Sequence, residues 1–201
     1  MSQGLIGSLL SPPPSLLAPV KRNVFISYFH GDQNEVDDFI GQYSTLERIF
    51  TPYMLSARQT YGGNPIESSN PNYVMQRIRS RHVSPTTVTI LLLGPCTHSR
   101  RYIDWETKAS LQQGGLGGER PNGVIAICLP SVGGHCHFPE RLSKNVDSGY
   151  AKAYIYPRSG NELRSWIEEA FQSRTNRQHL ILNSQNTWSN SRTCKICGRT
   201  H

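Results

Sequence analysis

Side chains that could bind and process a ligand gather directly after an apolar run near the start of the chain. This stretch offers hydroxyls, aromatic rings, an imidazole and a carboxylate, contributed by Ser27, Tyr28, Phe29, His30 and Asp32. Aromatic rings here can stack on a nicotinamide or adenine ring, and the imidazole can donate or accept a hydrogen bond. The alternative is structural: the two aromatic rings pack under helices and the carboxylate caps the first of them.

A second polar stretch, GPCTHSRRYIDWE (94–106), also follows an apolar run. Glu106 is its most interesting residue, because a carboxylate beside a bound sugar can hydrogen-bond ribose hydroxyls. The same carboxylate can stabilise the positive charge that develops as a glycosidic bond breaks. The alternative is that Asp104 and Glu106 only complement the positive end of a helix. Residue types and spacing leave both interpretations open.

Hydrophobic patterning predicts the elements that must position these two stretches. VFISY (24–28), TTVTILLLG (86–94) and GVIAICLP (123–130) are near-continuous apolar runs, which indicates strands buried on both faces. Apolar residues spaced by three and four predict a helix from about 33 to 48. The other expected elements are an edge strand at 50–55, helices at 73–81 and within 99–113, a short strand at 151–156, and a helix that begins near 159–161.

Alternating strands and helices of this kind predict a parallel sheet with helices on both faces. Five strands suit the doubly wound, flavodoxin-like order 2-1-3-4-5. Ligands of such sheets bind at the carboxyl ends of the strands where the winding reverses, here between the first and third strands. Residues 27–32 and 95–106 should therefore lie together at one edge of an α/β domain.

Composition divides the chain into three parts. Residues 1–20 contain four prolines among Ser, Leu and Gly, so we expect a flexible leader. The α/β domain should span 21–172, and 173–201 should form a basic polar tail. No apolar run is long enough to cross a bilayer, and no secretory signal is evident.

The distribution of the formal charge of +7 argues against nucleic-acid binding by the main part of the chain. Five basic residues and no acid lie in 172–201, which leaves only +2 for residues 1–171. These basic residues are spread among Asn, Ser, Gln and Thr, so we expect no nucleic-acid partner. Five cysteines, three of them in or beside predicted core elements, suggest reduced thiols and a cytoplasmic protein.

A possible metal-binding motif ends the chain. Cys194, Cys197 and His201 could supply three zinc ligands, but a structural zinc site needs four. His179 or a second subunit would have to complete it. An uncoordinated polar tail is the simpler interpretation, and we therefore expect no metal.

Three separated strings resemble one known family. They are NVFISYFHGDQ (23–33), TVTILLLGPCTHSRRYIDWE (87–106) and GYAKAYIYPRSGNELRSWIEEAF (149–171). They resemble the TIR-like family that includes the NAD-cleaving component of Thoeris antiphage defence, in the same order and over about residues 23–171. The resemblance implies an enzyme that cleaves NAD as its substrate, without a cofactor. It also implies a cyclic ADP-ribose isomer that signals to a downstream effector.

The resemblance also assigns residues by position. It makes Glu106 the catalytic acid of the family's Asp-Trp-Glu motif, and it places the first-strand motif on 27–30, although family members often have His where this chain has Phe29. The substrate-binding candidates are Ser27, Tyr28, Phe29, His30, Asp32, Thr97, Arg101 and Trp105.

The loop 56–72 occupies the position at which TIR domains place a loop that closes the nucleotide site and mediates self-assembly. The same crevice and loop also suit a second hypothesis, a TIR-like interaction module that binds another protein without turnover.

Overall fold

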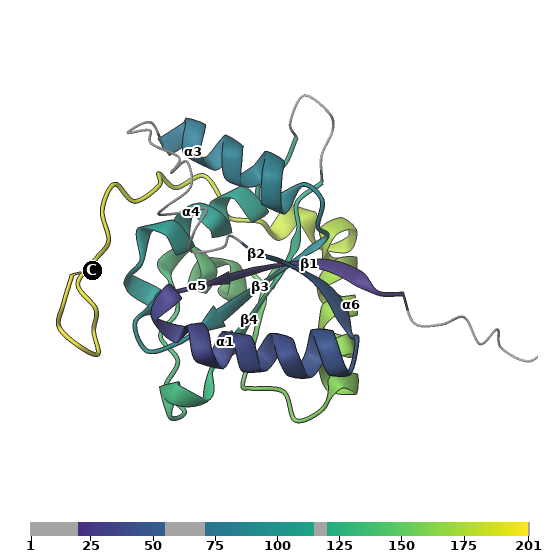
Figure 1. The fold of residues 1–201 in the computed structure, drawn as a ribbon. Coiled ribbons are helices and arrows are strands. Elements are labelled where there is room, and N and C mark those ends of the chain that lie inside the picture. Colours follow the sequence, from purple (N-terminus) through teal and green to yellow (C-terminus); the bar gives the residue numbers. More distant parts are fainter. Residues whose placement is uncertain (1–19, 55–70, 115–119, 201) are drawn as a thin grey trace, which may run out of the picture.

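Five parallel strands form one sheet at the centre of the protein (Figure 1). The structure, a computed structural model, describes residues 20–54, 71–114 and 120–200. In the order β2-β1-β3-β4-β5, the strands are β2 (Phe50–Met54), β1 (Arg22–Tyr28), β3 (Val88–Leu93), β4 (Gly123–Cys128) and β5 (Lys152–Tyr154). This order confirms the flavodoxin-like prediction, and it places the reversal of winding between β1 and β3.

Helices cover both faces of this sheet. α1 (Gln33–Ile40) and α6 (Gly160–Asn176) pack on one face, and α3 (Pro71–Ile78), α4 (Arg101–Ser110) and α5 (Glu140–Asp147) pack on the other. Successive side chains of β1 alternate between the faces: Val24 and Ile26 meet α1 and α6, whereas Phe25 meets α3 and α4.

Short 3-10 and π-helical turns join or extend these elements. They are η1 (His30–Asp32), η2 (Gly41–Leu46), η3 (Arg79–Val83), η4 (Thr97–Ser99), η5 (Pro130–Val132) and η6 (Gln178–Leu180). The first predicted helix, 33–48, is therefore α1 followed by a π-helical turn. As expected, β2 lies at the edge of the sheet. Pro52 has no backbone N–H to donate, which an edge strand tolerates and a central strand does not.

One helix, α5, was not predicted. Its buried residues are Arg141, Leu142 and Asn145, so two of the three are polar. An apolar periodicity cannot show a helix whose inward face is mostly hydrogen-bonding groups.

Two cysteines contradict the expectation of reduced thiols. Cys128, at the end of β4, and Cys136 form a disulfide, with their Cα atoms 6.0 Å apart. Gly133 and Gly134 both have positive φ, which lets the intervening loop turn back toward the strand. An odd number of cysteines excludes complete pairing but not one pair. The cytoplasmic placement stays a prediction, and no helix in the described ranges is long and apolar enough to cross a membrane.

Two predicted segments fall largely outside the described residues. The leader 1–20 is described only at Val20, and the loop 56–72 only at its last two residues, which begin α3. The bounds predicted for the domain and the tail stay a prediction, and α6, the last α-helix of the described residues, ends at Asn176.

Gly123 of β4 lies close to the backbone of α6 and provides a test of the packing. A Cβ atom there would overlap the backbone carbonyl oxygen of Ala170. We expect Gly123→Ala to lower the free energy of unfolding by about 1–3 kcal/mol, because the strand and helix must move apart. Urea unfolding measures this.

The matched control is Gly41→Ala, where an added Cβ meets nothing within 4 Å and φ is −55°. This change should alter stability by less than about 1 kcal/mol, in the stabilising direction. Equal effects of the two substitutions would contradict the close contact.

Candidate active site

Glu106 lies buried between α4 and the carboxyl end of β1. Ser27 leaves β1 on the same face of the sheet as Phe25, toward α4. Its Oγ donates a hydrogen bond of 2.5 Å to Oε2 of Glu106. The two residues are only 1% and 7% exposed. The structure thus brings together one residue from each of the two polar stretches.

Burial changes the acidity of this carboxyl group. It raises the pKa of Glu106 to about 7, and the hydrogen bond from Ser27 offsets only part of that rise. Within the described residues, no ion pair involves Glu106. A carboxyl group that titrates near neutral pH, buried at the ligand-binding edge of the sheet, is typical of a functional site.

Asp104, two residues earlier, has a different role. Arg141 of α5 donates to its Oδ1 at 2.9 Å, and the two side chains are almost completely buried. The backbone N–H of Trp188 donates to its Oδ2. Asp104 is therefore occupied in holding α4, α5 and the C-terminal segment together, whereas Glu106 is not.

A hydrogen-bonded group links the ends of β1 and β3. Thr97 Oγ1 donates to Oδ2 of Asp32 at 3.0 Å, and Gly94 N donates to Thr97 Oγ1. A Cβ atom at Gly94 would overlap the Asp32 carboxyl group, so the close approach requires glycine. Asp32 makes no capping hydrogen bond to α1. Its burial raises its pKa, and the bond from Thr97 opposes that rise.

Aromatic residues flank this group. The Phe29 and His30 rings meet edge to face, with centroids 4.4 Å apart. Tyr28 Oη donates to Gln33 at 2.8 Å. The guanidinium of Arg100 lies 3.6 Å from the centroid of the Phe29 ring. From the sequence we select Arg101 and not Arg100. The position of Arg100 directly before α4 is all that distinguishes it in the sequence.

Arg101 and Trp105, two predicted substrate-binding residues, contact the C-terminal segment. Arg101 Nη1 donates to the carbonyl oxygen of Ser189, and Trp105 Nε1 donates to that of Trp188 at 2.8 Å. The Trp105 ring itself packs in the apolar cluster of α3 and α4. The structure does not bring these two residues into contact with Ser27, Asp32 or Thr97.

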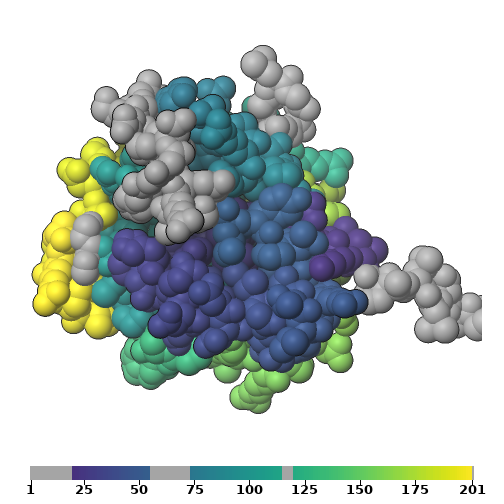
Figure 2. Space-filling model, viewed as in Figure 1, coloured from purple at the N-terminus to yellow at the C-terminus, as the bar shows by residue number. Residues whose placement is uncertain are grey.

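The C-terminal segment is not a loose extension. In Figure 1 it passes α4, and Figure 2 shows its end lying against the body of the domain. Lys108 and Arg141 donate to the carbonyl oxygens of Gln185 and Asn186, and Arg192 N donates to Ser99 O. Its polar side chains gave no sign of this docking, because the domain binds mainly its backbone.

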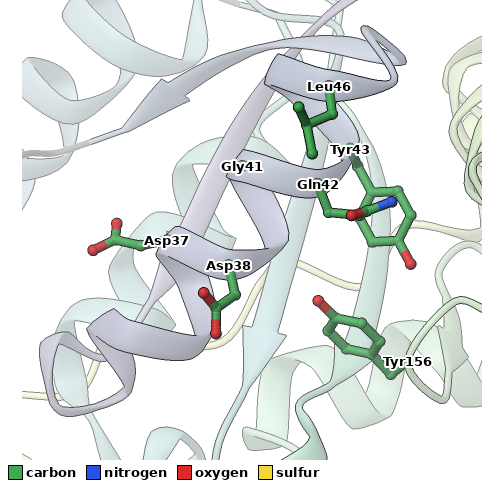
Figure 3. Close-up of a pocket in the computed structure, with 7 residues that line it drawn as sticks. All are labelled: Asp37, Asp38, Gly41, Gln42, Tyr43, Leu46 and Tyr156. Carbon is green, nitrogen blue, oxygen red and sulfur yellow. The ribbon is translucent and has the colours of Figure 1, made fainter.

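A separate pocket of about 600 Å³ lies beside α1 (Figure 3). Its lining residues are Asp37, Asp38, Gly41, Gln42, Tyr43, Leu46 and Tyr156. The exposed carboxylates of Asp37 and Asp38 would repel a pyrophosphate, and Tyr43 Oη already donates to Pro157 O. The edge formed by β1 and β3 is therefore the better candidate for a nucleotide site.

Comparison with known proteins assigns the chain to a family. Residues 25–133 match the family model described as Thoeris protein ThsB, TIR-like domain. The match covers more than half of the 201 residues and includes both polar stretches. No curated protein sequence matches the chain.

The raised pKa of Glu106 predicts a pH-dependent loss of stability. Between the ordinary value of 4.5 and about 7, the unfolded chain loses this proton while the folded protein keeps it. Stability should therefore fall with rising pH across that window, by about 3 kcal/mol in total. Glu106→Gln removes this penalty, so the variant should be more stable than the wild type above the window.

Urea unfolding of both proteins near pH 5 and pH 8 measures the difference. The control is Glu47→Gln, which removes an exposed carboxylate, and the effect of Glu106→Gln is compared with it at both pH values. If Glu106→Gln is no more stable than the wild type at the higher pH, the carboxyl group of Glu106 does not have a raised pKa.

Proposed function

The chain belongs to the Thoeris ThsB TIR-like family, and we propose that it cleaves the bond between nicotinamide and ribose in NAD. Family membership supports a role in Thoeris antiphage defence. The observation that carries the proposal is Glu106, a buried carboxyl group that titrates near neutral pH at the ligand-binding edge.

Glu106 acts in its ionised form, as a carboxylate. As the bond between ribose C1′ and the nicotinamide nitrogen breaks, its electron pair leaves with nicotinamide and positive charge develops on the ribose. The carboxylate stabilises that charge and accepts hydrogen bonds from ribose hydroxyls. Ser27 holds the carboxyl group in place through its 2.5 Å hydrogen bond.

The surrounding residues bind the rest of the substrate. Tyr28, Phe29 and His30 provide aromatic surface for the bases, and Asp32 and Thr97 form the polar group between the two strands. Water captures the ribosyl cation to give ADP-ribose, or a nucleophile of the adenosine part gives a cyclic isomer. We favour the cyclic product as a signal to a downstream effector, with self-assembly through the loop 56–72.

Arg101 and Trp105 act through the C-terminal segment in this scheme. Their hydrogen bonds to Ser189 and Trp188 fix the outer surface of α4, the helix that carries Glu106. They are positioning residues and do not need to touch NAD.

The direct test is NAD turnover by Glu106→Gln, with products resolved by chromatography and mass spectrometry. The change keeps the shape of the side chain but removes its charge, so nicotinamide release should fall by roughly 100-fold or more. Glu47→Gln should retain wild-type turnover. The assay should include a phage-derived stimulus, because the resting protein can be inactive.

Near-normal turnover by folded Glu106→Gln would remove this residue from the mechanism. A folded wild-type protein that releases no nicotinamide with any stimulus would favour the non-catalytic interaction module instead.

The pKa of Glu106 also predicts the pH profile. The mechanism needs the charged carboxylate, so kcat/KM for NAD should fall about tenfold per pH unit below about 7 and level off above it. The hydrogen bond from Ser27 lowers the pKa of Glu106, so Ser27→Ala should move the break to higher pH. A profile without a break between about pH 5.5 and 8.5 would contradict the assignment.

A further inference from the structure

Three cysteine sulfurs converge where the C-terminal segment meets the loop after β3. Cys96 lies in that loop, and Cys194 and Cys197 lie near the end of the chain. Cys194 Sγ is 3.3 Å from Cys96 Sγ, and Cys96 Sγ is 3.6 Å from Cys197 Sγ. All three sulfurs lie within 4.8 Å of one another. Sulfur ligands of a tetrahedral zinc ion lie about 3.8 Å apart, since each Zn–S bond is about 2.3 Å.

The backbone around Cys194 and Cys197 forms a tight turn that holds both sulfurs on one side. Gly198 N donates to Cys194 O, and Cys194 N donates to Arg199 O, both at 2.9 Å. Gly198 has a φ of +70°, which favours glycine. The two backbone hydrogen bonds hold the turn that carries the sulfurs of Cys194 and Cys197. Hydrogen bonds of this kind support the ligands of a metal site.

Arg100 provides an independent observation. The residue is 94% buried, and within the described residues its Nε and Nη2 have no hydrogen-bond acceptor. It interacts electrostatically with all three cysteines and with Asp32. Three neutral thiols would offer this buried cation little compensation. A divalent ion bound by three thiolates carries a net charge of −1, which adds to the counter-charge that Asp32 gives Arg100.

We propose that Cys96, Cys194 and Cys197 bind one zinc ion that fastens the C-terminal segment to the loop after β3. Three thiolates in a tetrahedral arrangement select zinc over the oxygen-preferring metals. The fourth position of the tetrahedron is open to water or to a further ligand, and His201 lies outside the described residues. His179 is not part of the group.

The sequence alone did not support this site because one ligand was missing from the motif. Cys96 stands 98 residues before Cys194 and resembles no part of a zinc motif. Only the fold brings it to the end of the chain. The proposal does not depend on NAD cleavage, so the two can fail separately.

Zinc content of the full-length protein tests the site. Protein kept reduced and supplied with zinc, then desalted, should contain roughly one zinc ion per chain by elemental mass spectrometry. Cys197→Ser changes an exposed side chain, so the variant should fold, and its zinc affinity should fall by about 100-fold or more. The matched control is the double variant Cys128→Ser, Cys136→Ser, which removes two sulfurs outside the group and should keep its zinc.

Two further measurements do not depend on enzyme activity. Cobalt-substituted wild type should show the visible absorption of a tetrahedral thiolate complex, and Cys197→Ser should not. A zinc chelator should speed proteolysis within residues 183–200 of the wild type. Reduced wild type without bound zinc, or Cys197→Ser with wild-type affinity, would overturn the proposal. A disulfide between Cys96 and Cys194 in protein kept reduced would overturn it as well.

Discussion

The position of α4 depends on one buried ion pair. Arg141 is fully buried, and an unpaired charge in that position would be strongly destabilising. Its partner Asp104 belongs to α4, and its remaining donors reach oxygen atoms of Asn183, Gln185 and Asn186. One guanidinium group thus joins α4, α5 and the C-terminal segment. Any change in this pair would alter the direction in which α4 presents Glu106.

The two acids of α4 show how one short motif can serve two purposes. Residues two apart on a helix point in different directions, so Asp104 meets α5 while Glu106 meets β1. Asp104 has a full counter-charge, whereas among the described residues the side-chain partner of Glu106 is the Ser27 hydroxyl group. Burial with this partner raises the pKa of Glu106 to about 7, so its carboxyl group can exchange a proton near neutral pH.

The sequence was sufficient for the sheet and for the place of the site. The three apolar runs at 24–28, 86–94 and 123–130 became β1, β3 and β4, and their order placed Ser27 beside Glu106. The sequence pattern did not predict the segments that bury polar atoms. α5 turns Arg141 and Asn145 inward, and the C-terminal segment docks through its backbone, so neither leaves an apolar pattern. The proximity of the Cys96 sulfur to those of Cys194 and Cys197 likewise depends on the fold alone.

The docking of the C-terminal segment also has a consequence for the order of synthesis. The ribosome makes all five strands and α5 before it makes residues 183–188. Until those residues emerge, Arg141 lacks its acceptors on Asn183, Gln185 and Asn186, and Asp104 lacks the N–H of Trp188. The nascent domain therefore holds an incompletely supported α4. A chain that terminates before residue 183 keeps Glu106 and Ser27 in its sequence. It lacks the contacts that hold the outer surface of α4, the helix that carries Glu106.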